Sequence, residues 1–282
     1  MNNSKMRFLY PAILGVVWLM AYTYTFDPKL DLNGDNCMYY ILSSSLASGQ
    51  GYTDLSNMTV SNTFPPGYPL LMTPLQWLTD SIFAQKVMNG LFMLAAILLL
   101  YFAMMRSGVR REVAFIAGLG MILTERTLHF ACIMMSEMSF LLCSALVVIS
   151  LLKRDEQKAF WRDKWFYLML GALALGYHVR TQGIALVGAV VIYHLFRKDW
   201  KTFLGTVGGF ILLALPWMLR NRVQGLGQSR YFETIQQANA FRPEDGMLDI
   251  GGIASRFFDT MGMLISQALP NSIIPAYPYA VL

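Results

Sequence analysis

Five charged side chains could do chemistry together in this sequence: Asp35, Glu137, Arg180, Arg220 and Arg222. A carboxylate can take a proton from a hydroxyl group, and a guanidinium can hold a phosphate through paired hydrogen bonds and a permanent charge. A site of this composition could displace a phosphate leaving group, with a carboxylate as the base and the arginines as phosphate ligands. The chemistry requires these residues to meet on one side of the molecule.

Asp35 is the preferred base, because it stands at the start of a predicted helix over residues 36–48. Tyr39 follows one turn later on the same helix face, so we expect it to bind substrate beside Asp35. Helix capping is a second explanation, since Asp is a favoured N-cap residue. The two roles are compatible.

Glu137 is the second catalytic candidate, and it interrupts the apolar stretch 130–152. A charged carboxylate near the bilayer centre costs roughly 2.5 to 3.5 kcal/mol on insertion scales, so Glu137 needs compensation. Three explanations stay open: interfacial water, a partner such as Arg180 or His178, or a divalent metal ion shared with Asp35. Magnesium or manganese would suit these oxygen ligands, although no residue spacing indicates a metal site.

Arg180 is the preferred phosphate ligand, since it lies in a tight turn between two short apolar segments. Arg220 and Arg222 follow it in preference and come directly after the Pro216-Trp217 helix end. Anchoring to lipid headgroups is the alternative for all three. His178 would assist Arg180, or it would simply be hydrogen-bonded at its helix end.

The elements that position these residues are membrane helices. Hydrophobic residues make up 55% of the 282 residues and charged residues 14%, against about 25% charged in soluble domains. About 20 helical residues cross the bilayer core, and several apolar runs approach that length. We therefore expect an all-α polytopic membrane protein. The three cysteines are too few for a disulfide framework or a cysteine-rich zinc site, and no nucleotide-binding fingerprint is present.

The hydropathy pattern predicts a single transmembrane domain with seven spans and a partial eighth. The segments are 8–26, 87–105, 113–125, 129–152, 164–179, 183–196, 202–219 and a partial one from 257. The first is read as a retained helix, because bulky aromatic residues stand where a signal peptide would have its cleavage site. More than half of the 22 basic residues fall in the short loops that alternation assigns to the cytoplasm, as the positive-inside rule expects. The N-terminus is then expected to be cytoplasmic. We expect the protein to be integral to the plasma (inner) membrane.

Two outer loops, 27–86 and 220–256, contain most of the candidate residues. The first is acidic and includes two predicted short helices, 36–48 and 70–78, which suit the membrane interface. The second is polar and rich in arginine. The predicted site is therefore extracytoplasmic.

The order of several strings resembles the GT-C superfamily of integral membrane glycosyltransferases. Within it, the branch of protein O-mannosyltransferases and bacterial aminoarabinose transferases is the most similar. The resemblance rests on Gly34–Tyr40, Leu46–Tyr52 and Pro65–Leu71 after an apolar first helix, then on Met135–Leu141 and His178–Gly183. It covers most of the chain.

This resemblance implies transfer of a hexose or pentose from a polyprenyl-phosphate donor to a lipid, glycan or protein acceptor, at the extracytoplasmic face. The first-loop Asp, here Asp35, would be the base or would orient the acceptor. Tyr68, within one of the strings, is expected to bind substrate. A helix bundle with a long outer first loop is the implied fold. Family members are usually longer, which suggests a C-terminally truncated chain.

Two other function classes remain. A transporter or flippase of a lipid-linked substrate would show an inverted repeat and ionisable groups at the membrane midplane, and the sequence shows neither. An inactive truncated membrane scaffold would explain the short length but not the ordered acidic loop. No nucleic-acid partner is expected.

Overall fold

The structure, a computed structural model, describes residues 3–29, 34–155, 158–226, 236–239 and 242–268. Helices account for nearly all of its regular structure. In chain order they are α1 (Asn3–Thr25), α2 (Asp35–Ala47), α3 (Gly67–Gln76), α4 (Ile82–Arg106), α5 (Arg111–Leu123), α6 (Glu125–Ala131), α7 (Glu137–Lys153), α8 (Lys164–Val179), α9 (Gly183–Phe196), α10 (Trp200–Val223) and α12 (Ile250–Met263). Short turns of helix lie at η1 (Phe160–Arg162), η2 (Pro243–Asp245) and η3 (Leu264–Ala268).

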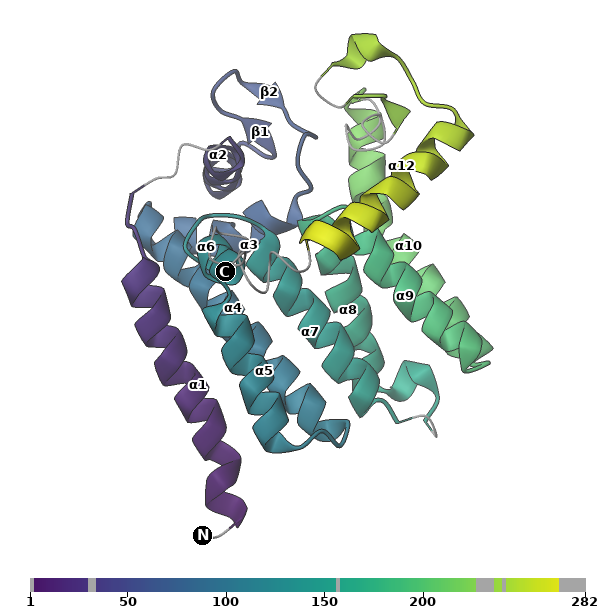
Figure 1. Cartoon of the computed structure of the whole chain (residues 1–282). Coiled ribbons are helices and arrows are strands. Elements are labelled where there is room, and N and C mark those ends of the chain that lie inside the picture. The colour runs from purple at the N-terminus through teal and green to yellow at the C-terminus, as the bar shows by residue number, and fades with distance from the viewer. Residues whose placement is uncertain (1–2, 30–33, 156–157, 227–235, 240–241, 269–282) are drawn as a thin grey trace.

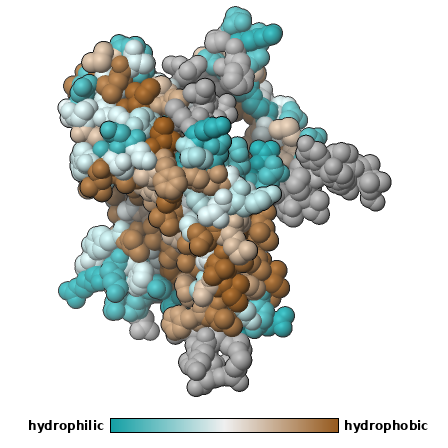
Figure 2. All heavy atoms as spheres, turned by 90° about the vertical axis from the view of Figure 1, so that its left-hand side faces the viewer, coloured by the Kyte–Doolittle hydropathy of each residue, from teal (hydrophilic) through white to brown (hydrophobic). Residues whose placement is uncertain are grey.

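The protein is an all-α polytopic membrane protein, as the composition predicts. Within the described ranges, α1, α4 and α10 are each long and apolar enough to cross a bilayer. The pair α5 and α6 meets the same test when taken together, although a 63° bend separates the two helices. Figure 2 shows the face over α1, where hydrophobic side chains gather across the middle and hydrophilic ones toward the ends. Helices α7, α8 and α9 are shorter, so the number of spans stays a prediction.

The predicted segment 129–152 is not one helix. It is divided between α6, which ends at Ala131, and α7, which begins at Glu137. Asn89 of α4 explains how the break is tolerated, because its buried side-chain amide donates hydrogen bonds of 2.7 Å to the carbonyl oxygens of both Phe130 and Ile133. Backbone acceptors that the interrupted helix would leave unpaired are thus satisfied.

The described residues of the segment 27–86, the first of the two predicted outer loops, fold over one end of the bundle (Figure 1). Helices α2 and α3 occupy most of the segments 36–48 and 70–78, each beginning slightly earlier than expected. Between them lies a small hairpin that the sequence did not predict, in which β1 (Thr53–Asp54) pairs antiparallel with β2 (Thr59–Val60). The Asp54 carboxylate accepts hydrogen bonds from the backbone N–H and hydroxyl of Ser56, which holds the connecting turn.

The two ends of the bundle differ in what they carry. Figure 1 places α2, the hairpin and α12 at one end, and the basic α4–α5, α7–α8 and α9–α10 connections at the other. Helix α7 packs between α4 and α8. It runs from one end of the bundle to the other (Figure 1). Which end faces the cytoplasm stays a prediction.

Candidate active site

Glu137, the first residue of α7, forms an ion pair with Arg180, which directly follows α8. Arg180 Nη1 lies 2.6 Å from Glu137 Oε1, with about a quarter of the Arg180 side chain and 21% of the Glu137 side chain exposed. Of the three explanations for Glu137, pairing with Arg180 is the arrangement in the structure. Arg180 also donates through Nη1 to the Ser136 hydroxyl at 3.1 Å and through Nε to Gln182 Oε1 at 3.0 Å.

Two glycines bring the backbone segments of this pair close together. A Cβ added at Gly67 would lie 2.5 Å from the carbonyl carbon of His178, so α3 contacts the end of α8 backbone to backbone. A Cβ at Gly183 would lie 2.6 Å from the backbone nitrogen of Tyr177, which shows how tight the turn around Arg180 is. Larger residues at either position would move Arg180 relative to α3.

Two tyrosines of the segment 27–86, Tyr39 and Tyr68, lie beside this ion pair. The Tyr39 hydroxyl lies 3.3 Å from Ser136 Oγ, and the Tyr39 and Tyr68 rings are 4.9 Å apart in an edge-to-face arrangement. Tyr68 is completely buried. Its hydroxyl and the Glu137 Oε2 atom have no hydrogen-bond partner among the described residues. Burial raises the pKa of Tyr68 well above its ordinary value, and the neighbouring Tyr39 and Glu137 raise it further.

We name these residues, Glu137, Arg180, Ser136, Tyr39 and Tyr68, the Glu137 cluster. Polar atoms buried without partners are uncommon in proteins. The unpaired Tyr68 hydroxyl and Glu137 Oε2 are therefore positions at which a hydroxyl-rich ligand could donate or accept hydrogen bonds.

Asp35 lies beside this cluster rather than inside it. It is exposed and is the first residue of α2, while Gly34 occupies the N-cap position without a side-chain capping bond. Capping therefore does not account for Asp35 here. Asp35 lines a shallow hollow of about 390 Å³, the walls of which include His129, Ile133 and Met135. Met135 immediately precedes Ser136, so the hollow and the Glu137 cluster are adjacent along the chain.

A much larger groove shares a wall with that hollow. Its volume is about 1240 Å³, and His129 and Ile133 line both spaces. The groove is lined by both apolar and polar residues. The apolar lining is Val17, Met20, Ala21, Leu123, Leu128 and Ile133, and the polar lining includes Asp27, Lys29, Lys86, Glu125 and His129.

Lys86 is a candidate that sequence reasoning missed. It is almost completely buried, and its ammonium donates to the backbone carbonyl oxygens of Asp27, at 2.8 Å, and Lys29. The hydropathy pattern predicts that Lys86 ends the loop 27–86, just before a span from residue 87. Helix α4 in fact begins at Ile82, which puts Lys86 on the helix, and its position next to an apolar span was the available signal.

The other predicted phosphate ligands have different surroundings. Arg220 donates to the carbonyl oxygens of Ser61 at 2.7 Å and Tyr52 at 3.1 Å, and its guanidinium lies 4.6 Å from the Trp217 ring centroid. It therefore holds the β1–β2 hairpin against α10. His178 Nε2 lies 3.2 Å from the carbonyl oxygen of Leu213 on α10. Arg222 is exposed. The structure does not bring these three residues into the Glu137 cluster.

A metal ligand set is not evident in the part of the chain that the structure describes. There, no three side chains of the types His, Cys, Asp and Glu are grouped so that they could hold a metal ion. A magnesium or manganese requirement stays a prediction.

Comparison with known families decides the class of protein. Residues 62–232, more than half of the chain, match the family described as dolichyl-phosphate-mannose-protein mannosyltransferase. The chain belongs to this family. Comparisons with curated proteins and with solved structures gave no match.

Family membership confirms the resemblance to the GT-C glycosyltransferases. The protein is a membrane glycosyltransferase of the mannosyltransferase type that uses a polyprenyl-phosphate-linked sugar donor, and the family implies a protein acceptor. The matched region begins within the segment 27–86 and includes Lys86 and the Glu137 cluster apart from Tyr39. Asp35 and Tyr39 lie before it.

Proposed function

We propose that the protein transfers a sugar from the polyprenyl phosphate to an acceptor hydroxyl beside Asp35, with Asp35 as the base. The observation that supports this most directly is the shared wall of the two cavities. A groove of about 1240 Å³, large enough for part of an isoprenoid chain and lined by apolar and polar residues, shares His129 and Ile133 with the hollow of Asp35.

The groove supplies the two environments that the donor needs. Val17, Met20 and Leu128 offer an apolar surface for the lipid chain, and Lys86, Lys29 and His129 offer donors and positive charge near the phosphate. In the step itself, the acceptor oxygen forms a bond to the anomeric carbon and its proton passes to the Asp35 carboxylate. The bond between the anomeric carbon and the phosphate oxygen breaks, and the polyprenyl phosphate leaves with the electron pair.

The Glu137 cluster would act on the sugar rather than on the phosphate. Arg180 is already neutralised by Glu137 at 2.6 Å, so its charge is less available to an anion than the sequence suggested. Glu137 Oε2 and the Tyr68 hydroxyl instead offer hydrogen-bond positions for sugar hydroxyls. We propose that Tyr39 and Tyr68 shape this subsite.

Substitution of Asp35 tests the proposed base. Membranes containing the full chain are incubated with polyprenyl-phosphate [14C]mannose and a serine- and threonine-rich peptide, and label in the peptide is counted. Asp35→Asn should lower turnover by roughly 10²- to 10⁴-fold, the range for loss of a general base. Asp80→Asn is the matched control, since Asp80 is an exposed aspartate of the same outer loop. Equal turnover in the two variants would rule out Asp35 as the base.

A second pair of variants tests the groove. Ala21→Trp fills the groove from α1, whereas Val16→Trp places the same ring on the exposed side of that helix. Ala21→Trp should raise the KM for the lipid-linked donor at least tenfold, and Val16→Trp should leave it unchanged. An unchanged KM in both variants would exclude the groove as the donor site.

A further inference from the structure

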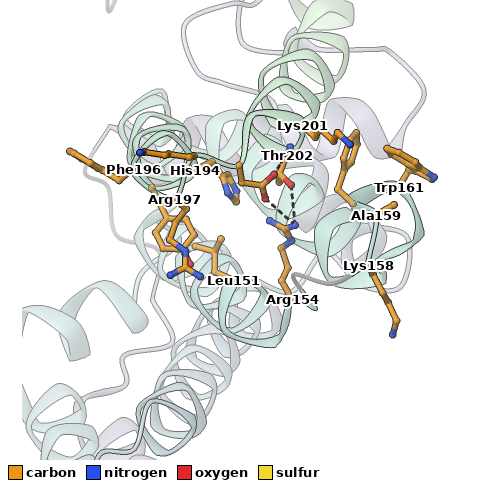
Figure 3. A pocket seen from close by; sticks show the side chains of 14 residues that line it. Leu151, Arg154, Lys158, Ala159, Trp161, His194, Phe196, Arg197, Lys201 and Thr202 are labelled. Atoms are coloured by element: carbon orange, nitrogen blue, oxygen red, sulfur yellow. Dashed lines mark hydrogen bonds and ion pairs between the residues drawn. The ribbon is translucent and has the colours of Figure 1, made fainter.

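A third cavity lies at the end of the bundle opposite to Asp35. It has a volume of about 700 Å³ and is bordered by the end of α7, the η1 turn, the end of α9 and the start of α10. Basic side chains dominate its charged lining: Arg154, Lys158, Arg197, Lys198 and Lys201 line it, against Asp199. Figure 3 shows Arg154 near the centre, with Arg197 to its left and Lys158 and Lys201 to its right. We call this cavity the basic pocket.

Three carboxylates of the described residues lie near the basic pocket, and each is within 4 Å of a basic side chain. Asp199 Oδ2 lies 3.6 Å from Arg154 Nη2, and Asp163 Oδ2 lies 3.8 Å from Arg154 Nε. Asp155 pairs with Lys158 at 3.2 Å. Over the described ranges, no carboxylate lies within ion-pair distance of Lys198 or Lys201. Within the described part of the chain, these two ammonium groups are therefore positive charges of the pocket lining that no carboxylate neutralises.

Lys198 has a backbone conformation that a lysine rarely adopts. Its φ is +55°, in the left-handed region, at the C-terminal end of α9. The surrounding hydrogen bonds, Lys198 N to Leu195 O and Asp199 N to His194 O, are those of a helix end at which glycine is usual. The Cβ of lysine makes this conformation less favourable than it is for glycine. The position therefore carries a charge where backbone stability alone favours glycine.

Aromatic side chains lie at the rim of the basic pocket, and apolar side chains are exposed on the helices α9 and α10 that border it. Trp161 and Phe196 are exposed at its edge. Beyond it, α9 and α10 present exposed apolar side chains, including Ile192 and Leu204. A phosphate on the lysines would leave any attached acyl chains lying along these helices. Basic pockets between membrane helices are a known form of site for anionic lipid headgroups.

We propose that the basic pocket binds a phosphate group, and that an anionic phospholipid supplies it. Lys198 and Lys201 hold the phosphate, and the aromatic rim contacts the glycerol and acyl region. This site is separate from the proposed donor groove and does not depend on the assignment of Asp35.

The test uses the full chain purified in detergent, with the temperature of half-unfolding as the readout. Phosphatidylglycerol, phosphatidylcholine and inorganic phosphate are added in separate arms. The test variant is Lys198→Gly/Lys201→Ala, which removes both charges while Lys198→Gly relieves the left-handed backbone. The control variant is Arg110→Ala/Lys164→Ala, which removes two exposed cations of the same end that do not line the pocket.

Phosphatidylglycerol should stabilise the wild-type chain more than phosphatidylcholine does. Its apparent Kd should rise about tenfold or more in Lys198→Gly/Lys201→Ala and should change little in the control variant. Stabilisation by inorganic phosphate with the same dependence on the two variants would support the site with a soluble phosphate as the source. No stabilisation by either ligand, or equal weakening in both variants, would overturn the proposal. Because Lys198→Gly favours the fold, lost binding in that variant cannot be ascribed to unfolding.

Discussion

Helix α7 has an arginine–carboxylate cluster at each end, and the two clusters differ in how deeply the arginine is buried and in how many carboxylates it pairs with. At one end Arg180 pairs with Glu137 at 2.6 Å, with both side chains partly exposed. At the other end Arg154 is only 6% exposed and lies between Asp163 and Asp199, at 3.8 and 3.6 Å. Arg154 also donates to the Thr202 hydroxyl at 3.0 Å.

The difference indicates two kinds of role. Asp163 and Asp199 are the N-cap residues of α8 and α10, so Arg154 ties the starts of two helices to the end of a third. That cluster is a structural brace. In the Glu137 cluster, Glu137 Oε2 and the Tyr68 hydroxyl have no hydrogen-bond partner among the described residues, so a ligand could bind there. Arg154 Nε has no hydrogen-bond partner in the described structure either, but it lies 3.8 Å from Asp163 Oδ2 within an ion pair.

Removing Arg154 should have the largest effect on stability. Arg154→Ala leaves two carboxylates without their buried partner, so the free energy of unfolding should fall by about 3–5 kcal/mol. The measurement is thermal or denaturant unfolding in detergent. A loss below about 1 kcal/mol would contradict the structural role that distinguishes this end of α7.

Adding a methyl group at Gly67 should have the next largest effect. Gly67→Ala forces α3 away from the end of α8, and overpacking of this kind costs about 1–3 kcal/mol. Sugar transfer should fall as well, because Tyr68 moves relative to Arg180. Gly188→Ala is the control, since a Cβ there meets no atom within 4 Å, and its unfolding temperature should be unchanged or higher.

Removing Arg180 should affect activity more than stability. The Glu137–Arg180 pair is partly exposed, so solvent screening limits its contribution, and Arg180→Ala should cost about 1 kcal/mol of unfolding free energy. Transfer of labelled mannose should nevertheless fall at least tenfold. Arg222→Ala, at an exposed arginine, provides the comparison. A stability loss as large as that of Arg154→Ala would erase the contrast between the two ends.

Tyr68→Phe should have the smallest effect on stability. It removes a buried hydroxyl that has no partner in the described structure, so the unfolding free energy should change by less than about 1 kcal/mol, or rise. Because the pKa of Tyr68 is raised, the folded state favours the neutral phenol. The neutral phenol therefore contributes fully to the free energy of unfolding below pH 10, the ordinary pKa of tyrosine, and this contribution is lost as the pH rises above that value. Tyr68→Phe should flatten the alkaline loss of stability. Undiminished sugar transfer in this variant would exclude the hydroxyl from the sugar subsite.

The helical architecture could be predicted because apolar runs and basic loops leave strong signals. The segments 164–179 and 183–196 coincide with α8 and α9. The break between α6 and α7 could not be predicted, because it depends on Asn89, a residue of another helix that satisfies the exposed carbonyls. The β1–β2 hairpin was missed for a similar reason, since Arg220, far along the chain, holds it in place.

The candidate site was predictable in its residue types but not in its pairings. An isolated Glu137 in apolar sequence signals a need for compensation, and Arg180 was one of the open alternatives. The sequence could not show that this pairing occupies Arg180, nor that Arg220 would bind backbone carbonyls. Lys86 escaped notice because its burial follows from where α4 starts and from how Asp27 and Lys29 fold back upon it.

The 63° bend between α5 and α6 has a kinetic consequence for the proposed enzyme. Leu123 and Glu125, on the two sides of the bend, line the proposed donor groove together with residues of α1. If the carrier occupies that groove, it arrives by lateral diffusion within the bilayer. The encounter rate would then follow the surface density of the carrier, and diluting the membranes with carrier-free lipid should slow the reaction even when the total amount of donor is held constant.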